Sequence, residues 1–212
     1  MREKPTRLKL PSFRRWLLQV HRDLLAIHQH VPSSIYPESL STFEKMVLVL
    51  EDRRFFKHAG NDYKSIVREL AKALTFRRHG GASTIDMQLV RTVTNRKEKT
   101  IRRKLYELML ARIIQYRYSK ARILRAYLSC AFFGSGLYGA NSVSMEEFGK
   151  ISEALDLDEA AQVASMLVYP KPLKPTAKWR GNVRRRADYG KLIYVRLEKQ
   201  LNELEIREPD YI

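Results

Sequence analysis

The chain has 212 residues, of which 44% are hydrophobic and 30% charged, a length that supports one sizeable core and is too short for two. Its formal net charge of +17 indicates a polyanionic partner, which leaves nucleic acid, an anionic bilayer and a diphosphate substrate as candidates. A single cysteine, Cys130, excludes an intramolecular disulfide, and no stretch is apolar and long enough to predict a transmembrane helix.

Residues 1–39 form a basic, amphipathic N-terminal segment. Six apolar residues are interspersed with basic ones, and neither the hydrophobic region nor the cleavage site of a secretory signal is recognisable. The apolar residues are Leu8, Leu10, Phe13, Trp16, Leu17 and Val20. This pattern predicts an interfacial helix that lies on a membrane without crossing it.

The first strongly periodic segment begins near Thr42 and ends at an acidic pair. Apolar residues recur at i, i+3, i+4 and i+7, which predicts an amphipathic helix that carries Glu51 and Asp52 at its C-terminal end. Carboxylates at that end oppose the helix dipole, so the pair is a candidate for a functional site. Pairing with Arg53 or Arg54 is the structural alternative.

Two more helices are expected on either side of a glycine turn. The first covers residues 63–76 and ends before Gly80 and Gly81. Ser83, three residues before Asp86, is predicted to cap the second. Thr84, Gln88 and Arg91 then share its polar face.

Residues 100–116 form the next predicted helix, with Arg103, Lys104 and Glu107 on one polar face. A surface ion pair between residues four apart is the structural alternative for Glu107. Ser119 is predicted to cap a helix that runs to Leu128.

The last third begins with residues 132–139, which alternate aromatic residues and glycines. This pattern favours a loop in which backbone segments approach closely and excludes a dinucleotide-binding turn, because no strand precedes it. Asp156 is predicted to cap a further helix, and a basic helix is predicted over about 182–204.

Five of these segments, in order, resemble the motifs of the peptidoglycan glycosyltransferase family, the polymerase domain of bifunctional penicillin-binding proteins and of monofunctional transglycosylases. They are residues 51–60 (EDRRFFKHAG), 81–91 (GASTIDMQLVR), 103–107 (RKLYE), 123–128 (ILRAYL) with Gly134, Gly136 and Gly139, and 159–161 (EAA) with Pro170. The sequence departs from the family pattern at Asp86, Ser129 and Lys99, where the family usually has Thr, Asn and Arg. Absence of a Ser-x-x-Lys transpeptidase motif indicates a monofunctional protein.

The resemblance implies an all-α fold with a lysozyme-like larger lobe and a small membrane-contacting jaw at about residues 61–79. The glycosyltransferase domain would cover residues 40–205, followed by a tail at 206–212. Glu51 would be the general base, and Glu107 a second catalytic carboxylate that orients Arg103 and Lys104 or holds a divalent cation, Mg²⁺ or Mn²⁺. The implied substrate-binding residues are Asp52, His58, Ser83, Thr84, Gln88, Arg91, Lys99, Arg103 and Lys104. For Asp52 and His58, orientation of the Glu51 loop is the alternative role.

The implied reaction polymerises a lipid-diphosphate-linked disaccharide, similar to lipid II, into glycan strands with inversion of the anomeric carbon. Its partners would be that substrate and an anionic membrane surface, with no nucleic acid. The resemblance favours a location at the periplasmic face of a bacterial inner membrane, peripheral or anchored, and the cytoplasmic face is the alternative because no signal or transmembrane segment is recognised. A lysozyme-like glycan hydrolase is one alternative, because paired carboxylates also cleave glycosidic bonds. A basic module that binds membrane or nucleic acid without catalysis is the other.

Overall fold

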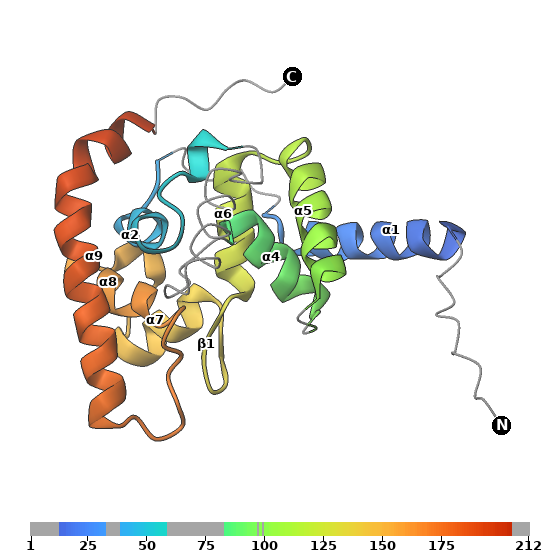
Figure 1. Ribbon diagram of the computed structural model, residues 1–212. Helices are drawn as coiled ribbons and strands as arrows, with labels where there is room; N and C mark the ends of the chain where they lie inside the picture. The colour runs from blue at the N-terminus through green and yellow to red at the C-terminus, as the bar shows by residue number, and fades with distance from the viewer. Residues whose placement is uncertain (1–12, 33–38, 59–82, 97, 99, 205–212) are drawn as a thin grey trace, which may run out of the picture.

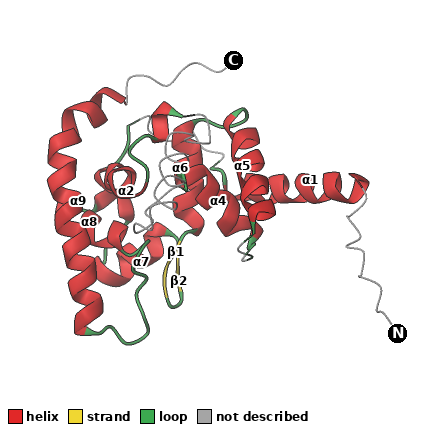
Figure 2. Cartoon of the chain, viewed as in Figure 1, coloured by secondary structure: helices red, strands yellow, loops and turns green. Residues whose placement is uncertain are grey.

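The computed structural model describes residues 13–32, 39–58, 83–96, 98 and 100–204, and these form a mainly helical molecule (Figures 1 and 2). The all-α class predicted from the sequence is thereby confirmed. The predicted jaw at 61–79, the helix at 63–76, Lys99 and the tail at 206–212 lie outside the described residues. The predicted boundary at residues 39 and 40 stays a prediction.

Helices account for most of the described chain. The elements are α1 (Phe13–His30), α2 (Thr42–Glu51), the 3-10 turn η1 (Phe55–Lys57), α4 (Ile85–Thr94), α5 (Ile101–Gln115), α6 (Lys120–Cys130), strands β1 (Phe132–Gly134) and β2 (Leu137–Tyr138), α7 (Ala140–Phe148), the 3-10 turn η2 (Ser152–Ala154), α8 (Leu157–Ser165) and α9 (Ala177–Leu204). The two strands pair antiparallel in a single hairpin.

Side-chain caps fix several helix starts where the sequence placed them. Asp156 and Glu159 form a reciprocal capping box on α8, and Ser119 caps α6. One predicted cap was wrong: α4 is capped by Thr84, whose hydroxyl accepts a hydrogen bond from the Met87 backbone N–H at 3.4 Å. Ser83 instead contacts two cationic side chains, described below.

The elements between α6 and α9 differ from the prediction in extent. Helix α7 was not predicted, because its Asn and Ser residues have weak helix propensity, and it is held by the burial of Val143. Helix α9 begins five residues earlier than predicted, after Thr176, whose hydroxyl accepts from the Trp179 N–H. Propensity alone misplaces both helices because tertiary contacts determine them.

The predicted close approach in the segment after α6 is confirmed, although part of it is a hairpin. A Cβ atom at Gly134 would lie 2.5 Å from the Lys171 carbonyl oxygen, and one at Gly139 would lie 2.7 Å from that of Ser129. The segments are joined there by a hydrogen bond from the Lys171 N–H to the Phe133 carbonyl, 2.8 Å long. Only glycine leaves room for this backbone contact.

Two packing groups share one core. Helix α2 packs against α8 and α9, while α4 packs against α5 and α6. Phe43, Met46 and Val47 of α2 are almost fully buried, which matches the predicted apolar face. The end of α2 that was predicted to be catalytic therefore belongs to a helix packed into the core.

The buried residues of helix α1 lie in its C-terminal half. Asp23 and Ile27 are buried, and the Tyr106 hydroxyl donates to Asp23 at 2.7 Å. The N-terminal half projects away from the body, and Phe13, Leu17 and Leu18 are exposed (Figure 1). Among the described residues, no helix combines the length and apolar character needed to cross a membrane.

Candidate functional site

Glu51 is the last residue of α2, and both of its carboxylate oxygens are held by other helices. Gln88 of α4 donates to Oε2 at 3.3 Å, and Arg186 of α9 donates to Oε1 at 2.7 Å. Arg186 also donates to the Leu50 carbonyl at 3.0 Å. The Glu51 side chain is 11% exposed, so the carboxylate is shielded but not sealed from solvent.

Gln88 is itself fixed by Tyr127 of α6. The Tyr127 hydroxyl donates to Gln88 Oε1 at 2.6 Å, which leaves the amide nitrogen to face Glu51. Burial, reinforced by the nearby Glu51 charge, raises the pKa of Tyr127. Because the phenol stays protonated at neutral pH, it remains a donor to Gln88 and sets the amide orientation.

Glu107 of α5 is fully buried inside a cationic cluster. Arg91 forms two hydrogen bonds with it, Nε to Oε1 and Nη2 to Oε2, each 3.1 Å long. Arg103, four residues before Glu107 on the same helix, pairs with Oε1 at 3.2 Å. A paired and hydrogen-bonded carboxylate is the form in which a buried charge is tolerated.

This pairing does not fit the divalent cation that the sequence allowed at Glu107. Two guanidinium groups already occupy its oxygens, and no second acidic ligand is placed there among the described residues. The structure therefore favours the other predicted role, in which Glu107 orients the cations around it.

Ser83 and Lys104 complete the cationic cluster. Ser83 Oγ accepts from Arg91 Nη2 at 3.2 Å and from Lys104 Nζ at 3.1 Å, so its own hydroxyl hydrogen is available for a ligand. Burial, together with the charge of Arg91, lowers the pKa of Lys104. Three cations thus surround one carboxylate, which leaves an excess of positive charge.

Helix α4 contacts both carboxylates. Gln88, which contacts Glu51, and Arg91, which contacts Glu107, are three residues apart on that helix. Side chains at this spacing are neighbours, with Cβ atoms about 5–6 Å apart. The predicted convergence of Glu51 and Glu107, 56 positions apart in the sequence, therefore depends on one turn of α4.

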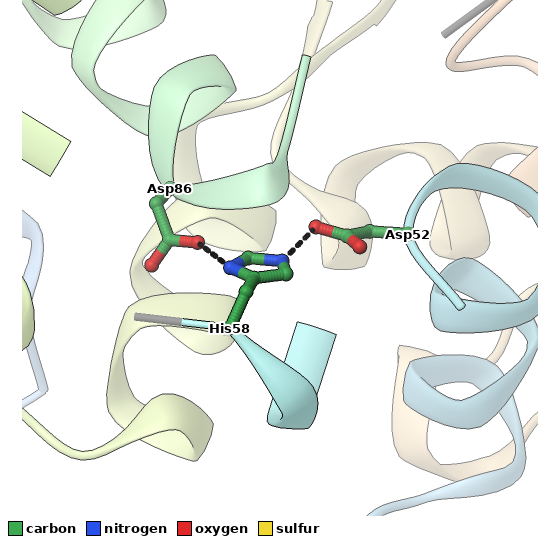
Figure 3. Close-up of side chains that lie close together, drawn as sticks. All are labelled: Asp52, His58 and Asp86. Carbon is green, nitrogen blue, oxygen red and sulfur yellow. Dashed lines mark hydrogen bonds and ion pairs between the residues drawn. The ribbon is translucent and has the colours of Figure 1, made fainter. Parts of the chain in front are cut away.

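A second polar cluster lies beside the end of α2 (Figure 3). His58 Nε2 lies 3.0 Å from Asp52 Oδ2, and His58 Nδ1 lies 3.9 Å from Asp86 Oδ2. Asp52 Oδ2 also accepts from the Ile85 N–H at 3.2 Å. Because Asp52 follows Glu51 directly, these contacts join the end of α2 to the start of α4.

Asp86 has its own cationic partner. Burial raises the pKa of this fully buried carboxyl group, and Lys120, with Nζ 3.3 Å from Oδ2, opposes that effect. Gln115 also donates to Asp86. Asp52, His58 and Asp86 lie close enough to share a metal ion, but Lys120 already supplies the neutralising charge. The geometry favours the orienting role for Asp52 and His58.

All but one of the predicted site residues that the structure describes fall into three groups. Glu51 and Gln88 form one contact, Ser83, Arg91, Arg103, Lys104 and Glu107 form the cationic cluster, and Asp52 and His58 form the joint between α2 and α4. Thr84 belongs to none, because its buried hydroxyl caps α4.

Sequence reasoning missed three contributors to the site. Tyr127 lies in the fourth motif, Arg186 lies in the predicted basic helix at about 182–204, and Lys120 directly follows the predicted cap of α6. Each contributes through a long-range contact, which spacing within one helix does not reveal.

The fold and the site define a mainly helical protein whose two shielded carboxylates are linked by one helix, one of them within a cationic cluster. A family model described as transglycosylase matches residues 24–191. The chain therefore belongs to the transglycosylase family, as the motifs indicated.

Curated relatives agree with this family. The chain is 36% identical over 132 residues to penicillin-binding protein 2a of Streptococcus pneumoniae, covering 62% of this chain and 18% of that protein. It is 33% identical over 152 residues to the biosynthetic peptidoglycan transglycosylase of Thiobacillus denitrificans, covering 71% of this chain and 64% of that protein. Penicillin-binding protein 1A of Rickettsia felis is 34% identical over 163 residues, which cover 75% of this chain and 20% of that protein. The chain thus matches about a fifth of either penicillin-binding protein.

Proposed function

We propose that this chain polymerises lipid-diphosphate-linked disaccharides, similar to lipid II, into glycan strands with inversion of the anomeric carbon, and that Glu51 is the general base. Membership of the transglycosylase family and the name of the Thiobacillus denitrificans relative support the reaction class. The observation that carries the role of Glu51 is its position at a helix end, with Gln88 and Arg186 each holding one oxygen.

On the acceptor side, the attacking sugar hydroxyl must lose its proton. Each carboxylate oxygen has two acceptor positions, so Glu51 retains capacity for a substrate hydroxyl while both neighbours hold its plane. A positioned general base typically contributes about 10²–10⁴-fold in rate.

On the donor side, the diphosphate leaving group gains negative charge as the glycosidic bond breaks. Arg91, Arg103 and Lys104 supply cations in fixed positions, and Ser83 supplies a hydroxyl donor. Glu107 holds the two guanidinium groups, so its role is to position them. Lys99, which lies outside the described residues, remains a predicted contact.

The substrate's lipid implies that the reaction takes place at a membrane. We place the protein at the periplasmic face of a bacterial inner membrane, peripherally bound or anchored, with an anionic lipid surface as its partner. The net charge of +17 and the exposed apolar residues of α1 support this location.

Incubation with a synthetic lipid-linked disaccharide-pentapeptide tests the proposal. The wild-type chain should form polymer, and Glu51→Gln should lower turnover by about 10² or more while the protein stays folded. Glu198→Gln, at an exposed position on α9, is the matched control and should retain activity. Soluble fragments from preformed glycan, without polymer from the precursor, would indicate a hydrolase and contradict synthesis. Full activity of Glu51→Gln would remove it as the base.

A further inference from the structure

A cavity of about 680 Å³ lies between the N-terminal half of α1 and the first turns of α5. Four arginines line it, Arg15, Arg96, Arg102 and Arg103, together with the apolar side chains of Trp16 and Leu105. The cavity is separate from Glu51 and adjoins the cationic cluster through Arg103 alone. The proposed role of Glu51 therefore does not account for this cavity.

The cavity carries more positive than negative charge. Arg96 pairs with Asp23 at 3.5 Å, and Arg103 pairs with Glu107 at 3.2 Å. Among the described residues that line the cavity there are four arginines and one acidic residue, Glu98, so the arginines outnumber the carboxylates even when Asp23 and Glu107 are counted. The first turn of α5 contains no acidic residue, and its free backbone N–H groups add partial positive charge. An anion is the complementary ligand.

Large apolar side chains exposed to solvent surround this charge. Phe13 stacks on Trp16, with ring centroids 5.9 Å apart, and is 74% exposed. Ile101 is 81% exposed and lies one turn before Leu105, which is 60% exposed, on the same face of α5. Apolar and aromatic groups mixed with arginines are typical of surfaces that insert into the headgroup region of a bilayer.

We infer that this cavity binds the phosphate headgroup of an anionic phospholipid, while Phe13, Trp16, Ile101 and Leu105 enter the boundary between headgroups and acyl chains. Binding there places the N-terminal end of α5, and with it Arg103 and Glu107, next to the bilayer that would supply the substrate. The inference rests on the proposed membrane location and does not depend on Glu51 as the base.

Vesicle binding by the full chain tests the site. Phosphatidylglycerol and phosphatidylcholine vesicles are compared, with the double variant Arg15→Gln/Arg102→Gln and the control Arg196→Gln/Lys199→Gln. Both remove two positive charges, but the control residues lie on α9, on the opposite side of the body from the projecting end of α1 (Figure 1). Neither pair includes a residue of the proposed catalytic machinery.

The cavity variant should bind phosphatidylglycerol vesicles about thirtyfold more weakly than wild type, and the control less than about threefold more weakly. Equal losses in both variants, or no loss in the cavity variant, would overturn the site, since the attraction would then be diffuse. Ile101→Ser should also weaken binding, and unchanged binding would contradict insertion. If the double variant Arg15→Gln/Arg102→Gln binds inorganic phosphate more weakly than wild type but binds vesicles equally well, the ligand is a soluble anion and the lipid assignment fails.

Failure of this inference and failure of the proposed function can be told apart. Glu51→Gln should bind vesicles as wild type does even where it forms no polymer. An active enzyme that shows no cavity-dependent vesicle binding would leave the polymerase proposal standing and contradict only the headgroup site.

Discussion

Lys104 is a cation whose charge is opposed by its own surroundings. Burial and the neighbouring Arg91 both disfavour the protonated form, so the pKa of Lys104 is lowered and its charge is lost at a lower pH than for an exposed lysine. If Lys104 binds the diphosphate in its protonated form, turnover should decline on the alkaline side as this proton leaves.

Lys104→Arg should therefore shift the alkaline limb of the pH–rate profile to higher pH, because an arginine stays protonated throughout the accessible range. Polymerisation of the lipid-linked disaccharide, measured across pH at saturating substrate, provides the profile. Lys199→Arg, an exposed substitution on α9, is the control and should leave the limb in place. An unchanged alkaline limb in Lys104→Arg would show that another group limits turnover there.

At the scale of single residues, the sequence predicts which residues belong to the candidate site better than it predicts which side chains they contact. Glu107, Arg103 and Lys104 were predicted together because they share one helix face, and the structure places them in one cluster. Arg186 has no such local signal, since its partner Glu51 lies 135 positions away. Tyr127 belongs to the fourth motif, but the contact of its hydroxyl with Gln88 depends on how α6 packs against α4.

At the scale of single elements, two adjacent hydroxyl side chains at the start of α4 are predicted to have different roles, Thr84 in stability and Ser83 in turnover. Thr84→Ala should lower the free energy of unfolding by about 1 kcal/mol, because the Met87 N–H loses its cap. Ser83→Ala should leave stability nearly unchanged and lower turnover, because Ser83 contacts Arg91 and Lys104. Urea denaturation and a polymerisation assay on both variants check the pair. The opposite pattern would restore Ser83 as the cap.

The contact between β1 and the segment at Lys171 gives a second test at this scale. Gly134→Ala should destabilise the fold by about 1–3 kcal/mol, because the new Cβ would lie 2.5 Å from a carbonyl oxygen and the backbone would have to shift. Gly181→Ala is the matched control, since nothing lies within 4 Å of its Cβ and α9 gains helix propensity there. Thermal unfolding should show a lower midpoint for the first variant and an equal or higher one for the second. Equal midpoints would contradict the close approach.

The whole molecule assembles the site from helices that are distant in the sequence. Helix α2 ends at Glu51, α5 carries Arg103, Lys104 and Glu107, and α4 contributes Gln88 and Arg91. Helix α9 runs along the side of the body opposite the projecting end of α1 and packs against α2 (Figure 1). The class of fold and most residues of the candidate site could be predicted because periodicity and motifs are local properties. The start of α9, and the orientation of this helix that directs Arg186 toward Glu51, could not be predicted, because packing against α2 and α8 determines them.

The orientation of α9 leads to a prediction about two adjacent arginines. Arg186 donates to Glu51 and to the Leu50 carbonyl, whereas Arg185 donates to Asn182 near the surface. Arg186→Gln should lower turnover on the order of tenfold to a hundredfold, because Glu51, the proposed base, loses one of the two groups that hold its plane. Arg186→Lys keeps the charge without the guanidinium fork and should recover part of that loss.

Arg185→Gln removes the same charge one position earlier and should stay within about twofold of wild type, since the contact of Arg185 is with Asn182 and not with a residue of the candidate site. Polymerisation rates for the three variants, measured beside their unfolding midpoints, decide the matter. Equal effects at positions 185 and 186 would show that α9 contributes net charge rather than a specific contact to Glu51.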